Sequence, residues 1–196
     1  TAEGDSSGMA PKHSIAYSNL TVARLNPLGL MNRTLIEYRY RLYDTPSLLK
    51  NDSYISVGVE PFITPAMARV SGTIFVKPLA ILRLRASYGV LAHYGNFQFT
   101  QSYDTPTAEY FTAEYYATKD NRYATVGSQG IFGALLQAKV GPVAIRNDLN
   151  FYRTDVDLED NTGLFGDDDV FYYIQDDMMI AAHGWHMTND SDVLYI

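Results

Sequence analysis

The segment from Thr73 to Val90 reads TIFVKPLAILRLRASYGV, and from Ala80 onward its residues sort by parity. Even-numbered positions there are apolar or aromatic, whereas odd-numbered positions include Arg83 and Arg85. Successive side chains of a β-strand point to opposite faces of the sheet. One face of this predicted strand is therefore apolar, and the other carries two guanidinium groups.

A matching run precedes Pro78. Between residues 68 and 76 the even positions are apolar or glycine, and the odd positions are polar or charged, with Arg69 among them and Phe75 as the exception. Proline fixes its own φ and cannot donate to a strand ladder. Residues 77–80 are therefore predicted to form the turn of a hairpin whose strands each have one apolar and one charged face.

This periodicity leaves two all-β architectures open. In a soluble sheet the apolar face packs inward and the charged face meets water. In a transmembrane β-barrel the apolar face meets lipid and the charged face lines the lumen. The rest of the sequence has to distinguish between these two arrangements.

The composition favours the membrane alternative. Hydrophobic residues make up 46% of the 196 residues and charged residues only 19%, whereas ordinary soluble domains contain about 25% charged residues. The 16 tyrosines suit the aromatic girdles found at bilayer interfaces.

A net charge of −7 argues against a nucleic-acid partner, because phosphate contacts require a basic surface. No apolar run is long enough for a transmembrane helix, and the absence of cysteine excludes disulfides and thiolate chemistry.

The chain is expected to consist of a flexible N-terminal tail over residues 1–12 and one β-barrel domain with long polar loops over residues 13–196. It begins without methionine or an apolar signal core, so we expect it to be processed or trimmed.

The strand predicted over Leu30–Tyr43 alternates clearly, and its length exceeds the usual five to six or so residues. A tilted membrane strand needs about 9–11 residues in the bilayer alone. Further strands are expected at His13–Leu25, Ser53–Ile63, residues 111–118, residues 131–140, residues 143–152 and Val170–Ile174.

Three predicted connections are tight and contain proline, namely Asn26–Gly29, Lys77–Ala80 and Gly141–Pro142. The segments between these hairpins are long and polar, so we expect short turns at one end of the strands and long loops at the other. That layout is typical of outer-membrane barrels, whereas a soluble sandwich usually places a turn every 8–12 residues or so.

In its long strands, proline-marked turns and tyrosine-rich apolar faces, the chain resembles Gram-negative outer-membrane β-barrel proteins over residues 13–155. The resemblance implies an antiparallel transmembrane up-and-down β-barrel in the bacterial outer membrane, with lipid as its partner and no enzymatic activity. Another envelope protein or a second copy of the chain is a further partner to consider. The C-terminal segment Asp192–Ile196 departs from the pattern, because such barrels end on an alternating strand with a terminal aromatic residue. Two explanations stay open: the chain stops before the barrel closes, or the barrel takes strands from elsewhere.

The charged faces define the candidate site. The residues predicted to face the lumen are Arg33, Glu37, Arg39, Arg41, Arg69, Lys77, Arg83, Arg85, Arg146 and Asp148. One hypothesis is a cationic wall that favours anionic solutes. The other is an internal ion-pair network that fills a narrow barrel, which is favoured because buried charge is normally paired.

Two further groups of residues are candidate sites. The acidic segment 155–169 could hold Ca²⁺ through carboxylates, but it lacks the glycine and distal glutamate of an EF-hand loop, so we expect a solvated loop. His183 and His186 lie near Asp176, Asp177 and Asp190 and could serve a hydrolase at the barrel rim. No spacing of the Gly-x-Ser-x-Gly or His-Glu-x-x-His type supports this hypothesis.

The sequence therefore predicts an outer-membrane β-barrel protein, porin-like or structural, with a cationic lumen wall. It predicts no catalytic residue, metal ligand or cofactor. The alternative is a soluble or secreted β-sandwich that binds a partner through its tyrosine-rich surface.

Overall fold

The structure is a computed structural model that describes residues 11–25, 28–95, 102–103, 107, 123–158, 170–173, 175–176 and 178–195. Every regular element in these ranges is a β-strand, and all the strand pairs are antiparallel. The all-β antiparallel class expected from the sequence is therefore confirmed. Across the same ranges, no helix has the length and apolar character needed to cross a membrane.

The main sheet contains eight strands, which follow the order of the chain. Each strand pairs with the one after it once the three short strands of the second sheet are left out. Its strands are, in order, β1 (His13–Leu25), β2 (Leu28–Arg41), β3 (Tyr54–Ile63), β4 (Met67–Leu79), β5 (Leu82–His93), β7 (Thr125–Val140), β8 (Val143–Val156) and β11 (His183–Tyr195). A second sheet of three short strands has the order β10 (Met178–Ala181), β9 (Val170–Tyr173) and β6 (Ser102–Tyr103).

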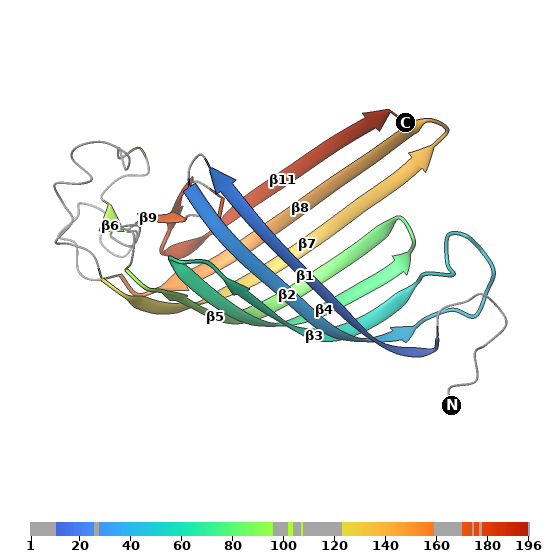
Figure 1. The fold of residues 1–196 in the computed structure, drawn as a ribbon, viewed down its shortest axis with the longest axis horizontal. Helices are drawn as coiled ribbons and strands as arrows, with labels where there is room; N and C mark the ends of the chain where they lie inside the picture. The colour runs from blue at the N-terminus through green and yellow to red at the C-terminus, as the bar shows by residue number, and fades with distance from the viewer. Residues whose placement is uncertain are drawn as a thin grey trace.

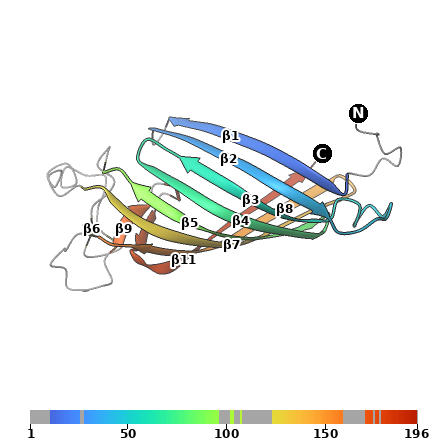
Figure 2. The same cartoon turned by 90° about the horizontal axis from the view of Figure 1, so that it is seen from below.

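The main sheet curls into a trough, with β1 and β11 at its two edges (Figures 1 and 2). The up-and-down strand order agrees with the expected topology. However, no pairing joins β1 to β11 within the described part of the chain, so the sheet is not closed into a barrel. The hydrogen-bonding edges of these two strands face no other strand of the main sheet.

The expectation that short turns would gather at one end is wrong. Successive strands run in opposite directions, so connections must alternate between the two ends of the sheet. The tight β1–β2 and β3–β4 connections lie at one end, whereas the tight β4–β5 and β7–β8 connections lie at the other. The two longest connections, β5–β7 and β8–β11, do share an end, and both termini of the sheet lie at the opposite end (Figure 1).

No strand was predicted after residue 174, but the C-terminal segment lies in one. It forms β11, which pairs with β8 along its full length of 13 residues. Asn189 and Ser191 interrupt the apolar parity of β11, and both accept hydrogen bonds from Asn147 of β8. The pairing with β8 therefore determines the strand, and the periodicity of the C-terminal segment alone does not predict it.

A short hairpin, β9–β10, covers the concave side of the sheet at the end that carries the longest connections (Figure 1). Its side chains pack on the sheet in one hydrophobic cluster. The cluster contains Phe62, Met67, Leu91, Val156, Phe171, Tyr173, Ile180 and Ala182. The strand expected at Val170–Ile174 agrees with β9, whereas residues 1–10, the strand predicted over residues 111–118 and most of the acidic segment 155–169 lie outside the described residues.

Candidate functional site

The convex face of the main sheet is apolar and its concave face is charged, which is the reverse of a soluble sheet. On the convex face, Ile36 is 51% exposed and Leu84 is 41% exposed. On the concave face, Glu37 and Arg69 are each only 2% exposed. The apolar face therefore points away from the protein, and charged side chains fill its interior.

A cluster of four polar side chains interrupts the apolar convex face on β1 and β2. Asn19 Nδ2 donates to Thr34 Oγ1 at 2.6 Å, and Asn32 Nδ2 donates to Thr21 Oγ1 at 2.8 Å. The two amides also exchange hydrogen bonds, each 3.2 Å long. Every amide hydrogen of the cluster thus has a partner within it, which lowers the cost of placing the cluster in apolar surroundings.

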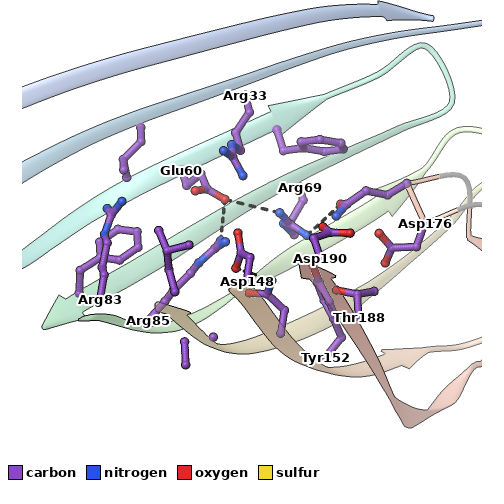
Figure 3. A pocket seen from close by; sticks show the side chains of 18 of the residues that line it. Arg33, Glu60, Arg69, Arg83, Arg85, Asp148, Tyr152, Asp176, Thr188 and Asp190 are labelled. Atoms are coloured by element: carbon purple, nitrogen blue, oxygen red, sulfur yellow. Dashed lines mark hydrogen bonds and ion pairs between the residues drawn. The ribbon is translucent and has the colours of Figure 1, made fainter. Parts of the chain in front are cut away.

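A cavity of about 650 Å³ lies on the concave face. Residues from both halves of the sheet line it, as Figure 3 shows for Arg33, Glu60, Arg85, Asp148, Tyr152 and Asp190. Arginines come mainly from β2, β4 and β5, whereas aspartates come from β8, β11 and the segment after β9. The wall of the cavity is thus divided into a basic side and an acidic side.

Glu60 is the central carboxylate of the basic side. Its Oε1 accepts a hydrogen bond from Arg85 Nη2 at 2.7 Å and lies 3.5 Å from Arg69 Nη2 (Figure 3). Arg69 also donates to Gln129 at 2.6 Å. Glu60 is not among the residues predicted to face the lumen, although the alternation of β3 places it on the same face as the buried Phe62 and opposite the exposed valines.

Glu37 forms a second centre on the same wall. It accepts hydrogen bonds from Arg39 Nε at 2.9 Å and from Ser56, and Arg83 Nη2 lies 3.7 Å from its Oε1. The guanidinium carbon of Arg83 lies 3.7 Å from the centroid of the Phe75 ring. This stacking explains why Phe75 breaks the polar parity of its strand, since it supports an arginine on the concave face.

Two of the predicted residues pair with acids of the β2–β3 connection. Lys77 pairs with Asp52, and Arg41 Nη2 lies 3.4 Å from Asp44 Oδ1. Both acids lie at the end of the sheet opposite the β9–β10 hairpin. Both acids are exposed, so these are surface ion pairs at the rim and not part of a buried network.

The remaining predicted residues divide between paired and unpaired groups. Arg146 pairs with Asp148 at 2.8 Å and with Asp192 at 3.0 Å. By contrast, the Arg33 side chain lines the cavity and has no hydrogen bond or ion pair to any described residue. The concave face thus contains both satisfied charges and at least one available guanidinium.

The two histidines lie on opposite faces of β11. His183 points to the convex side, where its Nδ1 pairs with Asp155. His186 points to the concave side, stacks on Tyr152 with ring centroids 4.5 Å apart, and lies 3.3 Å from Asp176 Oδ2. The two rings do not share a site, and Asp177 lies outside the described residues.

Hydrogen bonds fasten the β9–β10 hairpin to the wall beside the cavity. Tyr173 donates from its hydroxyl to Gln129 Oε1 at 3.2 Å and contacts Gln175 Oε1 at 3.0 Å. Burial raises the pKa of Tyr173, so its hydroxyl stays protonated and available as a donor. Gln129 therefore links the hairpin to Arg69 on the basic side of the cavity.

Comparison with family models, curated protein sequences and solved structures finds no match to the chain. The proposals below therefore depend on the geometry and chemistry of this chain alone.

Proposed function

We propose that the chain is an outer-membrane β-barrel protein of a Gram-negative envelope, with a polar interior that the β9–β10 hairpin covers at one end. The observation that carries the proposal is the inverted polarity of the sheet. Large apolar side chains are exposed along the convex face, and charged side chains are buried on the concave one. A soluble sheet of this size normally has the opposite arrangement.

The strands are long enough to cross a bilayer. Those of the main sheet contain between 10 and 16 residues, and a tilted transmembrane strand needs about 9–11. The sheet has an even number of strands, as bacterial single-chain barrels do. Strand number and length therefore both support a membrane barrel.

Closure of the sheet is part of the proposal. With eight alternating strands, β1 and β11 run in opposite directions, and each has 13 residues. Unpaired backbone groups cost several kcal/mol each in hydrocarbon. We expect the two edge strands to pair with each other when the chain enters a bilayer.

The interior supports binding or gated passage of a solute more than unrestricted diffusion. Arginines dominate the basic side of the cavity, and the β9–β10 hairpin packs over one end of the concave face through its hydrophobic cluster. A porin-like role would require this hairpin to move.

A soluble β-sandwich finds less support. In the described ranges, no second sheet packs on the convex face, and the three-stranded sheet lies on the concave side. Exposed apolar patches far larger than a few hundred Å² lead to association in soluble proteins. The convex face therefore requires a cover, and lipid is the cover that suits a belt of aliphatic and aromatic side chains.

Folding into a membrane mimic tests the proposal. We expect the refolded chain to migrate differently on gels before and after heating in detergent. Trp185, the single tryptophan, is 61% exposed on the convex face. Its fluorescence should shift to the blue in phosphatidylcholine vesicles and be quenched by brominated lipids. A chain that folds without detergent or lipid, with Trp185 insensitive to brominated lipids, would rule out the proposal.

A further inference from the structure

The geometry points to an anion-binding site on the concave face, formed by Arg33, Arg83 and Arg85, for a small molecule with a carboxylate, phosphate or sulfate group. This inference rests on the proposed function, because it names the class of solute that the barrel interior would take. The site itself needs only the concave face of the sheet.

Positive charge is in excess on this wall. The charged side chains that line the cavity are five arginines, Arg33, Arg69, Arg83, Arg85 and Arg146, and four carboxylates, Glu60, Asp148, Asp176 and Asp190. Four of the arginines lie on the basic side, where Glu60 is the one carboxylate among the described lining residues, so positive charge is in excess on that side. Buried charge is normally balanced by a partner of opposite sign. An anion in the cavity would supply the missing negative charge.

Several guanidinium N–H groups have no partner to satisfy them. The Nε and Nη2 atoms of Arg83 are buried and have no hydrogen-bond partner, since Glu37 is too distant at 3.7 Å. The side chain of Arg69 is 2% exposed, and its Nε is also unsatisfied. Arg33 lines the same cavity without a described partner. The buried nitrogens of Arg83 and Arg69 are closed to solvent, so an anion in the cavity would meet the accessible parts of the arginines instead. Arg33 is exposed, and the side chains of Arg83 and Arg85 are 27% and 15% exposed. An anion that accepts hydrogen bonds from these accessible groups would be stabilised by charge-assisted contacts.

Two of the three arginines are held in place before any ligand arrives. Arg83 stacks on Phe75, and Arg85 donates to Ser87 at 2.8 Å and to Glu60 at 2.7 Å. Guanidinium groups bind carboxylate and phosphate oxygens through two parallel hydrogen bonds. A fixed set of such groups loses little conformational entropy on binding.

The opposite wall limits which anions fit. Asp148 is paired with Arg146, and Asp176 contacts His186, but Asp190 lines the cavity with no described partner. A second negative charge on that side of the ligand would be repelled. The site therefore favours a small molecule with an anionic group at one end and hydrogen-bond donors, such as hydroxyl or ammonium groups, at the other.

Calorimetric titration of the detergent-folded chain with inorganic phosphate, sulfate and acetate tests the inference. We expect saturable binding that weakens about tenfold or more in Arg33→Gln, because one charge-assisted contact is lost. The Arg33 side chain has no hydrogen bond or ion pair to a described residue, so this variant should fold normally, which heat-dependent gel mobility would verify. The matched control is Lys139→Gln, which removes an exposed positive charge of β7 that does not line the cavity and has no ion pair to a described residue, so it should change affinity less than about twofold.

Two results would overturn the inference: no saturable binding of any of the three anions to the folded chain, or equal losses of affinity in Arg33→Gln and Lys139→Gln. The barrel proposal would survive both results if Trp185 still responded to brominated lipids. Conversely, anion binding by a chain that folds without detergent or lipid would keep the site and rule out the barrel.

Discussion

Replacing Ile74 with arginine separates a lipid-facing sheet from a soluble one. Ile74 lies near the middle of β4 on the convex face, pairs with Val57 and Ala86, and is 50% exposed. At the bilayer midplane an outward arginine costs about 2–4 kcal/mol in a transmembrane barrel. At the surface of a soluble sheet, substitutions away from special features usually change stability by less than about 0.5 kcal/mol.

The matched variant is Ile63→Arg, because Ile63 has the same side chain and similar exposure, 52%, but lies at the end of β3. Near the interface, the same change costs only about 0–1 kcal/mol. Urea unfolding from phosphatidylcholine vesicles would measure both free energies of unfolding. We expect Ile74→Arg to be the less stable variant by about 2 kcal/mol, the difference between the midplane and interfacial values. Equal effects of the two variants, within about 0.5 kcal/mol, would refute a lipid-facing Ile74.

Three other predictions concern the interior and the turns. Glu60→Gln should lower the free energy of unfolding in urea by about 3–5 kcal/mol, because buried guanidinium groups lose their shared carboxylate; a loss under about 1 kcal/mol would contradict that pairing. Tyr173→Phe removes a donor to Gln129 and should raise conductance in planar bilayers by loosening the hairpin, whereas unchanged current would count against a gate. Gly141→Ala should destabilise by about 1–2 kcal/mol because its φ is +59°, whereas Gly72→Ala, with no atom nearer than 4.0 Å to the added Cβ, should be nearly neutral in the same titration.

Parity predicted the strands whose two faces differ most. The division of β2 into an apolar and a charged face was visible in the sequence. The bounds of β1 are also as expected, although its two faces are poorly sorted. The hairpin turn after β4 lies at residues 80–81, slightly beyond the predicted segment 77–80, because Pro78 sits within the end of the strand. Local periodicity was sufficient there because each strand carries its own signal.

The misses have a common physical cause, which is that long-range pairing decided the outcome. β11 carries Asn189 and Ser191 on its otherwise apolar face, and only pairing with β8 sets its register. The contacts of the β9–β10 hairpin with the sheet join residues far apart in the chain, such as Tyr173 and Gln129. No periodicity in a single segment encodes such contacts.

For the candidate site, the sequence identified the basic residues but not their geometry. The concentration of arginines on one set of faces was predicted, whereas Glu60 and Asp190 were not included. Whether an arginine is paired depends on side chains from neighbouring strands. Arg33 and Arg146 each lie on the charged face of a predicted strand, so the alternation of residues does not distinguish them. Among the described residues, however, only Arg146 has acidic partners.

The most direct test of the account asks what surrounds the convex face. The chain contains no cysteine, so a single Cys can be introduced at Ile74 and labelled with a nitroxide after folding into phosphatidylcholine vesicles. Electron paramagnetic resonance would then compare collisions with oxygen, which partitions into hydrocarbon, and with a water-soluble nickel chelate. We predict frequent collisions with oxygen and few with nickel. A label that nickel reaches as readily as it reaches a free spin label in water would contradict the central claim.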